Sequence, residues 1–149
     1  TLSAPTVIHW GMVVPEALPA LYEHGVRVLS GSFRERSWGR DVNYWQDRER
    51  CEWLARNEAL KDFDSGVVFS NIDLCGNTTP LEEIEPRLQD LAACPRTAEV
   101  MDLFTHEQYF WPFYHNYLPD HSDRLDAMLR WVTEHAYEPV FFHEDYPGA

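Results

Sequence analysis

The chain of 149 residues carries 25 acidic and 12 basic side chains, so its formal net charge at neutral pH is −13. This length suits one domain that buries a real core, and a content of 44% hydrophobic and 14% aromatic residues excludes a disordered chain. The acidic excess argues against nucleic acid or an anionic membrane as the partner, and no apolar run approaches the roughly 20 residues of a membrane span.

The cysteines and the first residues give no sign of secretion. Cys51, Cys75 and Cys94 are odd in number and irregularly spaced, so neither a disulfide framework nor a zinc-type pair is expected. Residues 1–5 contain neither a methionine nor a basic segment, and no apolar stretch follows them, so no targeting signal can be read. We expect a cytoplasmic location, and two readings of the start stay open: a removed leader or a piece of a longer protein.

Short β-rich runs alternate with amphipathic helices along the chain. Strands are expected over residues 6–10, 26–29, 67–73, 100–105 and 139–142. Helices are expected between them, over residues 15–24, 48–60 and 80–94 and again after residue 120. Strands that alternate with helices of this length are typical of βαβ units, which build a parallel sheet.

Several helix ends carry local signals. Pro15 suits the first turn of a helix, and Gly25 suits the position just after the last turn. Asp47 and Asp120 are expected to cap helices, and residues 79–82 (Thr-Pro-Leu-Glu) form a capping-box pattern.

One segment departs from the alternating pattern. Residues 32–61 are interpreted as an irregular insertion with a short strand over residues 42–45, because Gly31, Gly39 and several charged side chains lie near their start. The fold class is therefore α/β, with parallel βα units in a single domain over residues 1–149.

Four of the expected strands end in ionisable or metal-competent side chains. In parallel sheets, ligands bind beyond the carboxyl ends of the strands, so these groups converge if the strands are neighbours. The residues at these ends are His9 with Trp10, Asp73, His106 with Glu107, and His143. Imidazole and carboxylate groups there are able to hold a divalent ion or to act as general acid and base. The alternative for each is structural, a hydrogen-bonded histidine or an aspartate that caps a loop, and no His-x-x-x-His spacing supports a metal site.

An unusually aromatic segment follows the strand at 100–105. Residues 109–117 read Tyr-Phe-Trp-Pro-Phe-Tyr-His-Asn-Tyr, and Tyr109 and Trp111 are candidate ligand-binding residues. Aromatic faces pack against the apolar faces of sugar rings, so the segment is either a lid or sugar platform, or a hydrophobic plug for the core.

Other chemistries have little support. The sequence contains no Gly-x-Gly-x-x-Gly, no phosphate loop and no Gly-x-Ser-x-Gly elbow, which argues against nucleotide binding and serine hydrolysis. Cys75 follows an expected strand, but without an obvious activating base it is interpreted as a packed thiol.

Several segments together resemble the C-terminal half of polysaccharide deacetylase-like (NodB-type) proteins. They are His9-Trp10-Gly11 and residues 15–25, 105–110, 131–134 and 139–142, of which 106–110 is the most specific. The resemblance implies a distorted (β/α)7 barrel whose enzymes use a divalent metal, such as zinc, to remove acetyl groups from carbohydrates. It places His106 where the family's late catalytic acid ends its strand, and His9 at an equivalent strand end. If the chain is an enzyme, we expect His106 to be the acid, with Asp73, His9 and Glu107 as supporting groups.

The chain also departs from that family. The aspartate pair and the His-x-x-x-His motif of the family's N-terminal half are absent, and only about four or five βα strands are expected where a closed barrel needs seven or eight. We therefore expect an open sheet or an incomplete (β/α) barrel that is not a competent carbohydrate deacetylase alone. The alternatives are a non-catalytic carbohydrate or small-ligand binder and a truncated protein. Because an incomplete barrel exposes sheet edges, a homodimer or a partner chain that completes the sheet is expected.

Overall fold

The computed structural model describes residues 5–33 and 43–141, which form two compact units. The first unit contains the described residues up to Ile72 together with Val140 and Phe141, and the second unit contains Asp73–Pro139. None of the helices within these ranges combines the length and apolar character that a membrane crossing requires. The protein is a mixed α/β structure without a closed barrel in its described part, and the single domain over residues 1–149 stays a prediction.

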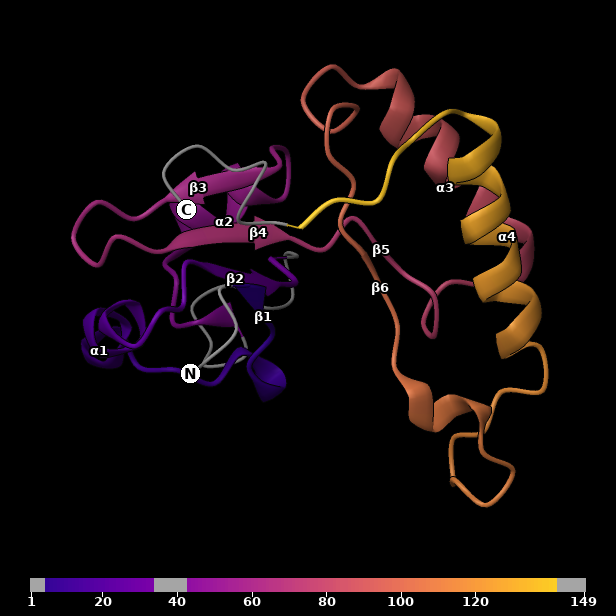
Figure 1. Cartoon of the computed structure of the whole chain (residues 1–149), viewed down its shortest axis with the longest axis horizontal. Helices are drawn as coiled ribbons and strands as arrows, with labels where there is room; N and C mark the ends of the chain where they lie inside the picture. Colours follow the sequence, from indigo (N-terminus) through magenta and orange to yellow (C-terminus); the bar gives the residue numbers. More distant parts are fainter. Residues whose placement is uncertain (1–4, 34–42, 142–149) are drawn as a thin grey trace. The chain divides into compact units, whose positions relative to one another are not determined.

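The first unit is built on a four-stranded sheet (Figure 1). Its strands are β1 (Pro5–Thr6), β2 (Val28–Gly31), β3 (Ala59–Lys61) and β4 (Val68–Asn71). They lie in the order β1-β2-β4-β3, in which β1, β2 and β4 run parallel and β3 is antiparallel to β4. The expected parallel pairing is thus present, with one antiparallel strand added at the edge.

The helix between β1 and β2 follows its sequence signals. It consists of the 3₁₀ turn η2 (Pro15–Ala17) and helix α1 (Leu18–Glu23). Gly25 has a φ of 101°, and its N–H bonds to the carbonyl of Tyr22 while the N–H of Val26 bonds to that of Leu21. This pair of bonds is the Schellman ending that glycine favours, so both predicted helix ends are confirmed.

The next helix is shorter than expected. Helix α2 (Arg48–Leu54) starts as predicted, because the Asp47 side chain accepts a hydrogen bond from the Arg50 N–H at 2.8 Å. The prediction of a helix to residue 60 is wrong. The Asn57 side chain binds the carbonyl of Trp53 at 2.7 Å, and the chain then extends into β3, where pairing with β4 outweighs further helix.

The prediction of a strand over residues 42–45 is also wrong for residues 43–45, the part of this range that the structure describes. Asn43 to Gln46 form a turn, and Tyr44 and Trp45 have φ values of 59° and 56°, in the left-handed region. Tyrosine and tryptophan are enriched in strands because they pack well there, and here a tertiary contact of Tyr44 decides the backbone conformation instead.

Tyr44 lies at the centre of the first unit and is 0% exposed. Its hydroxyl donates to the Ser30 carbonyl at 2.6 Å and accepts the Ile8 N–H at 3.2 Å, and its ring centroid lies 5.7 Å from that of Phe69. A Cβ atom on Gly31 would lie only 2.7 Å from the Tyr44 ring, so this approach requires glycine. The surrounding core also includes Leu18, Val26, Leu29, Phe33, Cys51, Leu54 and Val67.

Two further expected strands differ from the structure. The strand at residues 6–10 ends at Thr6, because a bond from the Gly11 N–H to the Ile8 carbonyl closes the 3₁₀ turn η1 (His9–Gly11). At the other end, residues 139–141 form no strand, and Phe142 lies outside the described residues.

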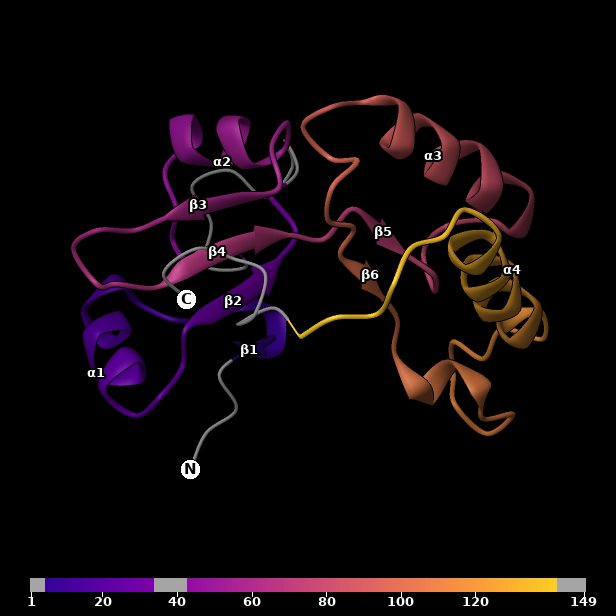
Figure 2. The ribbon, with the colours of Figure 1, turned by 45° about the horizontal axis from the view of Figure 1, so that its top comes forward.

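The second unit packs two helices against a two-stranded sheet (Figure 2). Strands β5 (Leu74–Cys75) and β6 (Leu103–Phe104) are parallel, and the helices are α3 (Leu81–Ala93) and α4 (His121–Glu134). Their shared core contains Leu74, Ile84, Leu88, Met128 and Trp131.

Neither predicted cap in the second unit forms. The Thr79 hydroxyl is buried and has no hydrogen-bond partner among the described residues, while Pro80 occupies the cap position of α3. Asp120 instead accepts a hydrogen bond from Arg124 Nε at 2.9 Å, and this bond lowers the pKa of the carboxyl group. A pairing within the first turn of α4 therefore replaces the backbone cap.

Removal of the Tyr44 hydroxyl is expected to destabilise the protein. Tyr44→Phe deletes a donor and an acceptor inside the core, a change that typically costs about 1–3 kcal/mol. Urea unfolding followed by circular dichroism measures the effect. Tyr22→Phe is the matched control, because the Tyr22 hydroxyl makes no hydrogen bond in the described part of the chain. Equal stability of the two variants would contradict the role given to Tyr44.

Self-association stays a prediction, and the strand order identifies the two sheet edges at which a second chain would pair. Within the described residues β1 and β3 form the edges of the sheet, and Phe63, just after β3, is 89% exposed. Unpaired edges favour pairing with another chain, so multi-angle light scattering should give twice the mass of one chain. A strictly monomeric mass at micromolar concentration would refute this expectation.

Candidate functional site

The predicted site residues are distributed over both units. His9 and Trp10 belong to the first unit, where both are exposed in η1 and their rings make an edge contact at 5.8 Å. Neither comes directly at a strand end, because β1 stops at Thr6. His143 lies outside the described residues.

Asp73 lies at the amino end of the β5–β6 pair. Its N–H bonds to the Asp102 carbonyl at 3.0 Å, and its carboxylate accepts the Asp102 N–H at 2.9 Å. The strand predicted to end at Asp73 ends at Asn71, and a new strand starts at Leu74. The structure therefore does not bring Asp73 together with His106, which follows the carboxyl end of β6.

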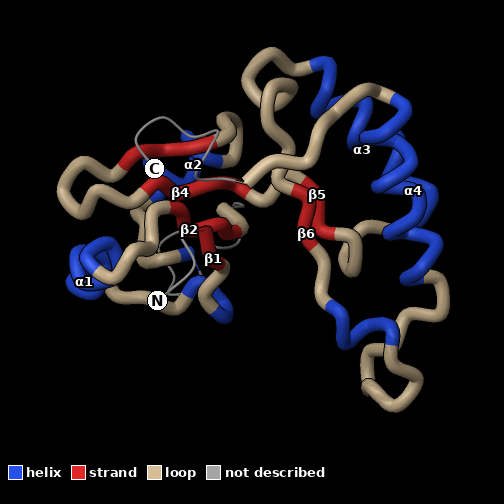
Figure 3. Tube along the Cα trace, in the orientation of Figure 1, coloured by secondary structure: helices blue, strands red, loops and turns tan. Residues whose placement is uncertain are grey.

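His106 lies beyond the carboxyl ends of β5 and β6, and a side-chain amide holds its ring. Figure 3 shows these two strands as short segments within long loops. Its Nδ1 lies 3.0 Å from the side-chain oxygen of Asn77, and the thiol of Cys75 donates to the same oxygen at 3.2 Å. Because an amide oxygen only accepts, Nδ1 carries a proton, and in the neutral ring the lone pair is on Nε2. Asn77 is itself buried, so it fixes the orientation of the imidazole.

Tyr109 packs beside this pair. It belongs to the 3₁₀ helix η5 (Glu107–Phe110), and its ring lies 6.0 Å from that of His106 and 5.4 Å from that of Tyr114. Burial raises the pKa of the Tyr109 phenol, the neighbouring Tyr114 and Cys75 add to this effect, and a hydrogen bond with Asn77 partly opposes it. The phenol therefore stays neutral and able to donate a hydrogen bond at physiological pH.

His121 completes the group, and no motif in the sequence pointed to it beyond its place after Asp120. It is 1% exposed, and its Nε2 lies 3.2 Å from both the Thr105 hydroxyl and the His106 carbonyl. Because the carbonyl accepts, Nε2 carries the proton, and the buried Nδ1 has no partner among the described residues. We call Cys75, Asn77, His106, Tyr109 and His121 the strand-end cluster.

The side chains of the aromatic segment, residues 109–117, differ in whether they pack inward or are exposed. Tyr109 and Phe110 contact the ring of His121, so they pack inward as a plug does. Trp111 and Phe113 are 51% and 87% exposed, and their rings stack at 6.0 Å with an angle of 16° between their planes. The predicted catalytic residue Glu107 is exposed. The segment therefore combines an exposed pair of nearly parallel rings with side chains that pack inward.

The described residues do not fit the divalent metal that the resemblance implies. They contain no group of three or more histidine, cysteine, aspartate or glutamate side chains able to hold an ion. Of the three residues considered as ligands, His9 lies in the first unit, and Asp73 and His106 lie at opposite ends of the β5–β6 pair.

No family model, no curated protein and no solved structure matches this chain. The family resemblance therefore stays an expectation based on the quoted residues. The function has to be argued from the chemistry of the site, since a fold alone does not imply a function.

The environment of Tyr109 predicts a late tyrosine ionisation. Because the folded pKa is raised, the phenol contributes stability that is complete below about pH 10 and is lost as the pH rises through the folded pKa. An alkaline titration followed by tyrosinate absorbance should show a late phase that Tyr109→Phe removes. In denaturant this phase should merge with the others, and a late phase that survives Tyr109→Phe would contradict the assignment.

Proposed function

We propose that this chain is a deacetylase-like domain that binds a carbohydrate at the segment after β6 and does not hydrolyse acetylated sugars by itself. The observation that carries the proposal is the exposed, stacked pair of Trp111 and Phe113 on the same segment as His106. The binding of a carbohydrate is the function that this arrangement supports best.

The exposed aromatic pair supports a ligand with flat apolar faces. Single exposed apolar side chains are common on protein surfaces, whereas contiguous exposed apolar surface commonly marks a binding site. A sugar ring presents C–H groups on its faces and hydroxyl groups around its rim. Trp111 and Phe113 suit the faces, because both rings are exposed and nearly parallel.

The strand-end cluster supports the polar side of the same ligand. Tyr109 keeps a neutral phenol, and His106 is oriented by the buried amide of Asn77. Groups that are fixed before binding lose little conformational entropy when they meet a hydroxyl group, and such preorganisation increases affinity. A few fixed polar groups beside an aromatic surface are typical of small-molecule sites.

The relation to an incomplete barrel is part of the proposal. The segments β1–α1–β2 and β5–α3–β6 are parallel βαβ units, the repeat from which (β/α) barrels are made. We take these strands as the βα strands of a partial barrel. The absence of a metal-binding group from the described residues supports binding without hydrolysis.

The test is a titration with oligosaccharides by calorimetry, with chitooligosaccharide as the acetylated probe. Trp111→Ala should lower the affinity by about tenfold, the ratio that corresponds to about 1.4 kcal/mol. Trp53→Ala is the matched control, because Trp53 is also an exposed tryptophan (43%) but lies in α2 of the first unit. Unchanged affinity in Trp111→Ala, or the same loss in the control, would reject the platform.

A second assay separates binding from catalysis. Turnover of a chromogenic acetyl ester should be absent, also with added zinc or cobalt, in the parent protein and in His106→Ala. Metal-dependent turnover that His106→Ala abolishes would replace the proposal by an enzymatic function, with His106 in the role that the resemblance implies.

A further inference from the structure

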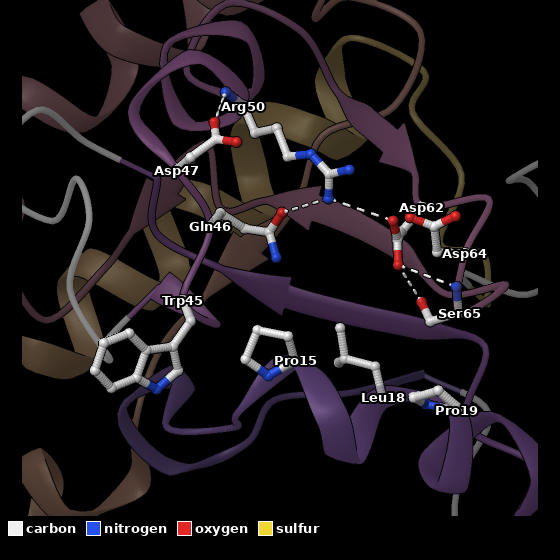
Figure 4. Close-up of a pocket in the computed structure, with 10 residues that line it drawn as sticks. All are labelled: Pro15, Leu18, Pro19, Trp45, Gln46, Asp47, Arg50, Asp62, Asp64 and Ser65. Atoms are coloured by element: carbon white, nitrogen blue, oxygen red, sulfur yellow. Dashed lines mark hydrogen bonds and ion pairs between the residues drawn. The ribbon is translucent and has the colours of Figure 1, made fainter.

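A pocket of about 250 Å³ lies in the first unit, and none of its lining residues belongs to the strand-end cluster (Figure 4). It is bounded by η2 and α1, by the turn that precedes α2, and by the connection between β3 and β4. This volume is below the range typical of drug-sized ligands, so the pocket suits a small molecule.

The pocket has two chemically different walls. Pro15, Leu18 and Pro19 lie along one side with the indole of Trp45 at one end, as Figure 4 shows. The opposite wall is a hydrogen-bonded chain of polar side chains, which runs through Gln46, Arg50, Asp62 and Ser65. A ligand that fills the pocket therefore needs an apolar body and a polar group.

The charges of the polar wall favour a cation. Asp47, Asp62 and Asp64 line the pocket together with a single cation, Arg50. Arg50 donates to Asp62 at 3.3 Å, so its charge is balanced within the wall, whereas the exposed carboxylate of Asp64 makes no hydrogen bond or ion pair with the described residues. An anion would meet an excess of carboxylates here, and a cation would be attracted by them.

Trp45 continues the left-handed turn that Tyr44 begins. Its φ of 56° lies in the left-handed region, where residues with a side chain are strained and glycine is not. Its side chain is nonetheless 48% exposed at the end of the pocket. The turn that places Tyr44 in the core therefore also places the indole of Trp45 at the pocket.

The geometry points to a primary alkylammonium ion as the ligand of this pocket. The ammonium group lies at Asp64, beside the Asp62 end of the polar wall, and the alkyl chain extends along Leu18 and Pro15 to the ring of Trp45. This site is independent of the carbohydrate site, because it uses only residues of the first unit.

The test is an NMR titration of ¹⁵N-labelled protein with hexylammonium, with hexanoate as the matched anion. Hexylammonium should shift the backbone amides of residues 45–50 and 62–65, and hexanoate should not. Asp64→Asn should weaken binding by about fivefold. Asp90→Asn removes the same charge from an exposed position in α3 and should leave the affinity unchanged. No shifts at about 10 mM ligand, well above typical ligand dissociation constants, equal binding of hexanoate, or equal effects of the two variants would overturn the proposal.

A second variant separates binding from folding. Trp45→Gly should keep or raise the melting temperature, because glycine accepts a φ of 56° without strain, and should weaken hexylammonium binding several-fold. A lower melting temperature with unchanged binding would assign Trp45 a structural role and reject the proposal. A blocked lysine derivative as a second probe distinguishes the sources of the group: tighter binding than hexylammonium identifies a protein lysine, and weaker binding a free amine.

Discussion

The hydroxyl group of Tyr44 joins the turn that precedes α2 to the sheet of the first unit. It binds the carbonyl of Ser30 in β2 and the N–H of Ile8 after β1, while its ring packs between Phe33 and Phe69. To place the ring there, the backbone takes a left-handed conformation that continues into Trp45. The same turn therefore completes the core and exposes the indole at the pocket, so core and pocket depend on one local conformation.

In the second unit, side chains supply the connections that very short strands cannot. Strands β5 and β6 have two residues each, and so short a pair gains little from its own backbone bonds. Asp73 binds the backbone of Asp102 at the amino end, and Asn77 binds His106 beyond the carboxyl end. These two bonds fix the register between the strands, and the register in turn decides which residues meet at the site.

Local signals predicted the parts of the fold that local physics determines. The ends of α1 depend on Pro15 and Gly25, and the strand-end rule found the segment that carries His106. The turn at Tyr44 could not be predicted, because its conformation is set by Ser30 and other residues distant in sequence. Likewise the place of Asp73 follows from the strand register, which the spacing of residues does not reveal.

The hydrogen bond between His106 and Asn77 bears on how the proposed carbohydrate site is organised. The amide oxygen of Asn77 at Nδ1 fixes the orientation of the imidazole. Asn77 also accepts from the thiol of Cys75, so its oxygen is engaged by two donors. His121 adds a second imidazole whose Nε2 is directed at a carbonyl and a hydroxyl group within the protein. Such a network fixes the orientation of its members before any ligand binds, and this preorganisation suits the proposed recognition of a hydroxylated ligand.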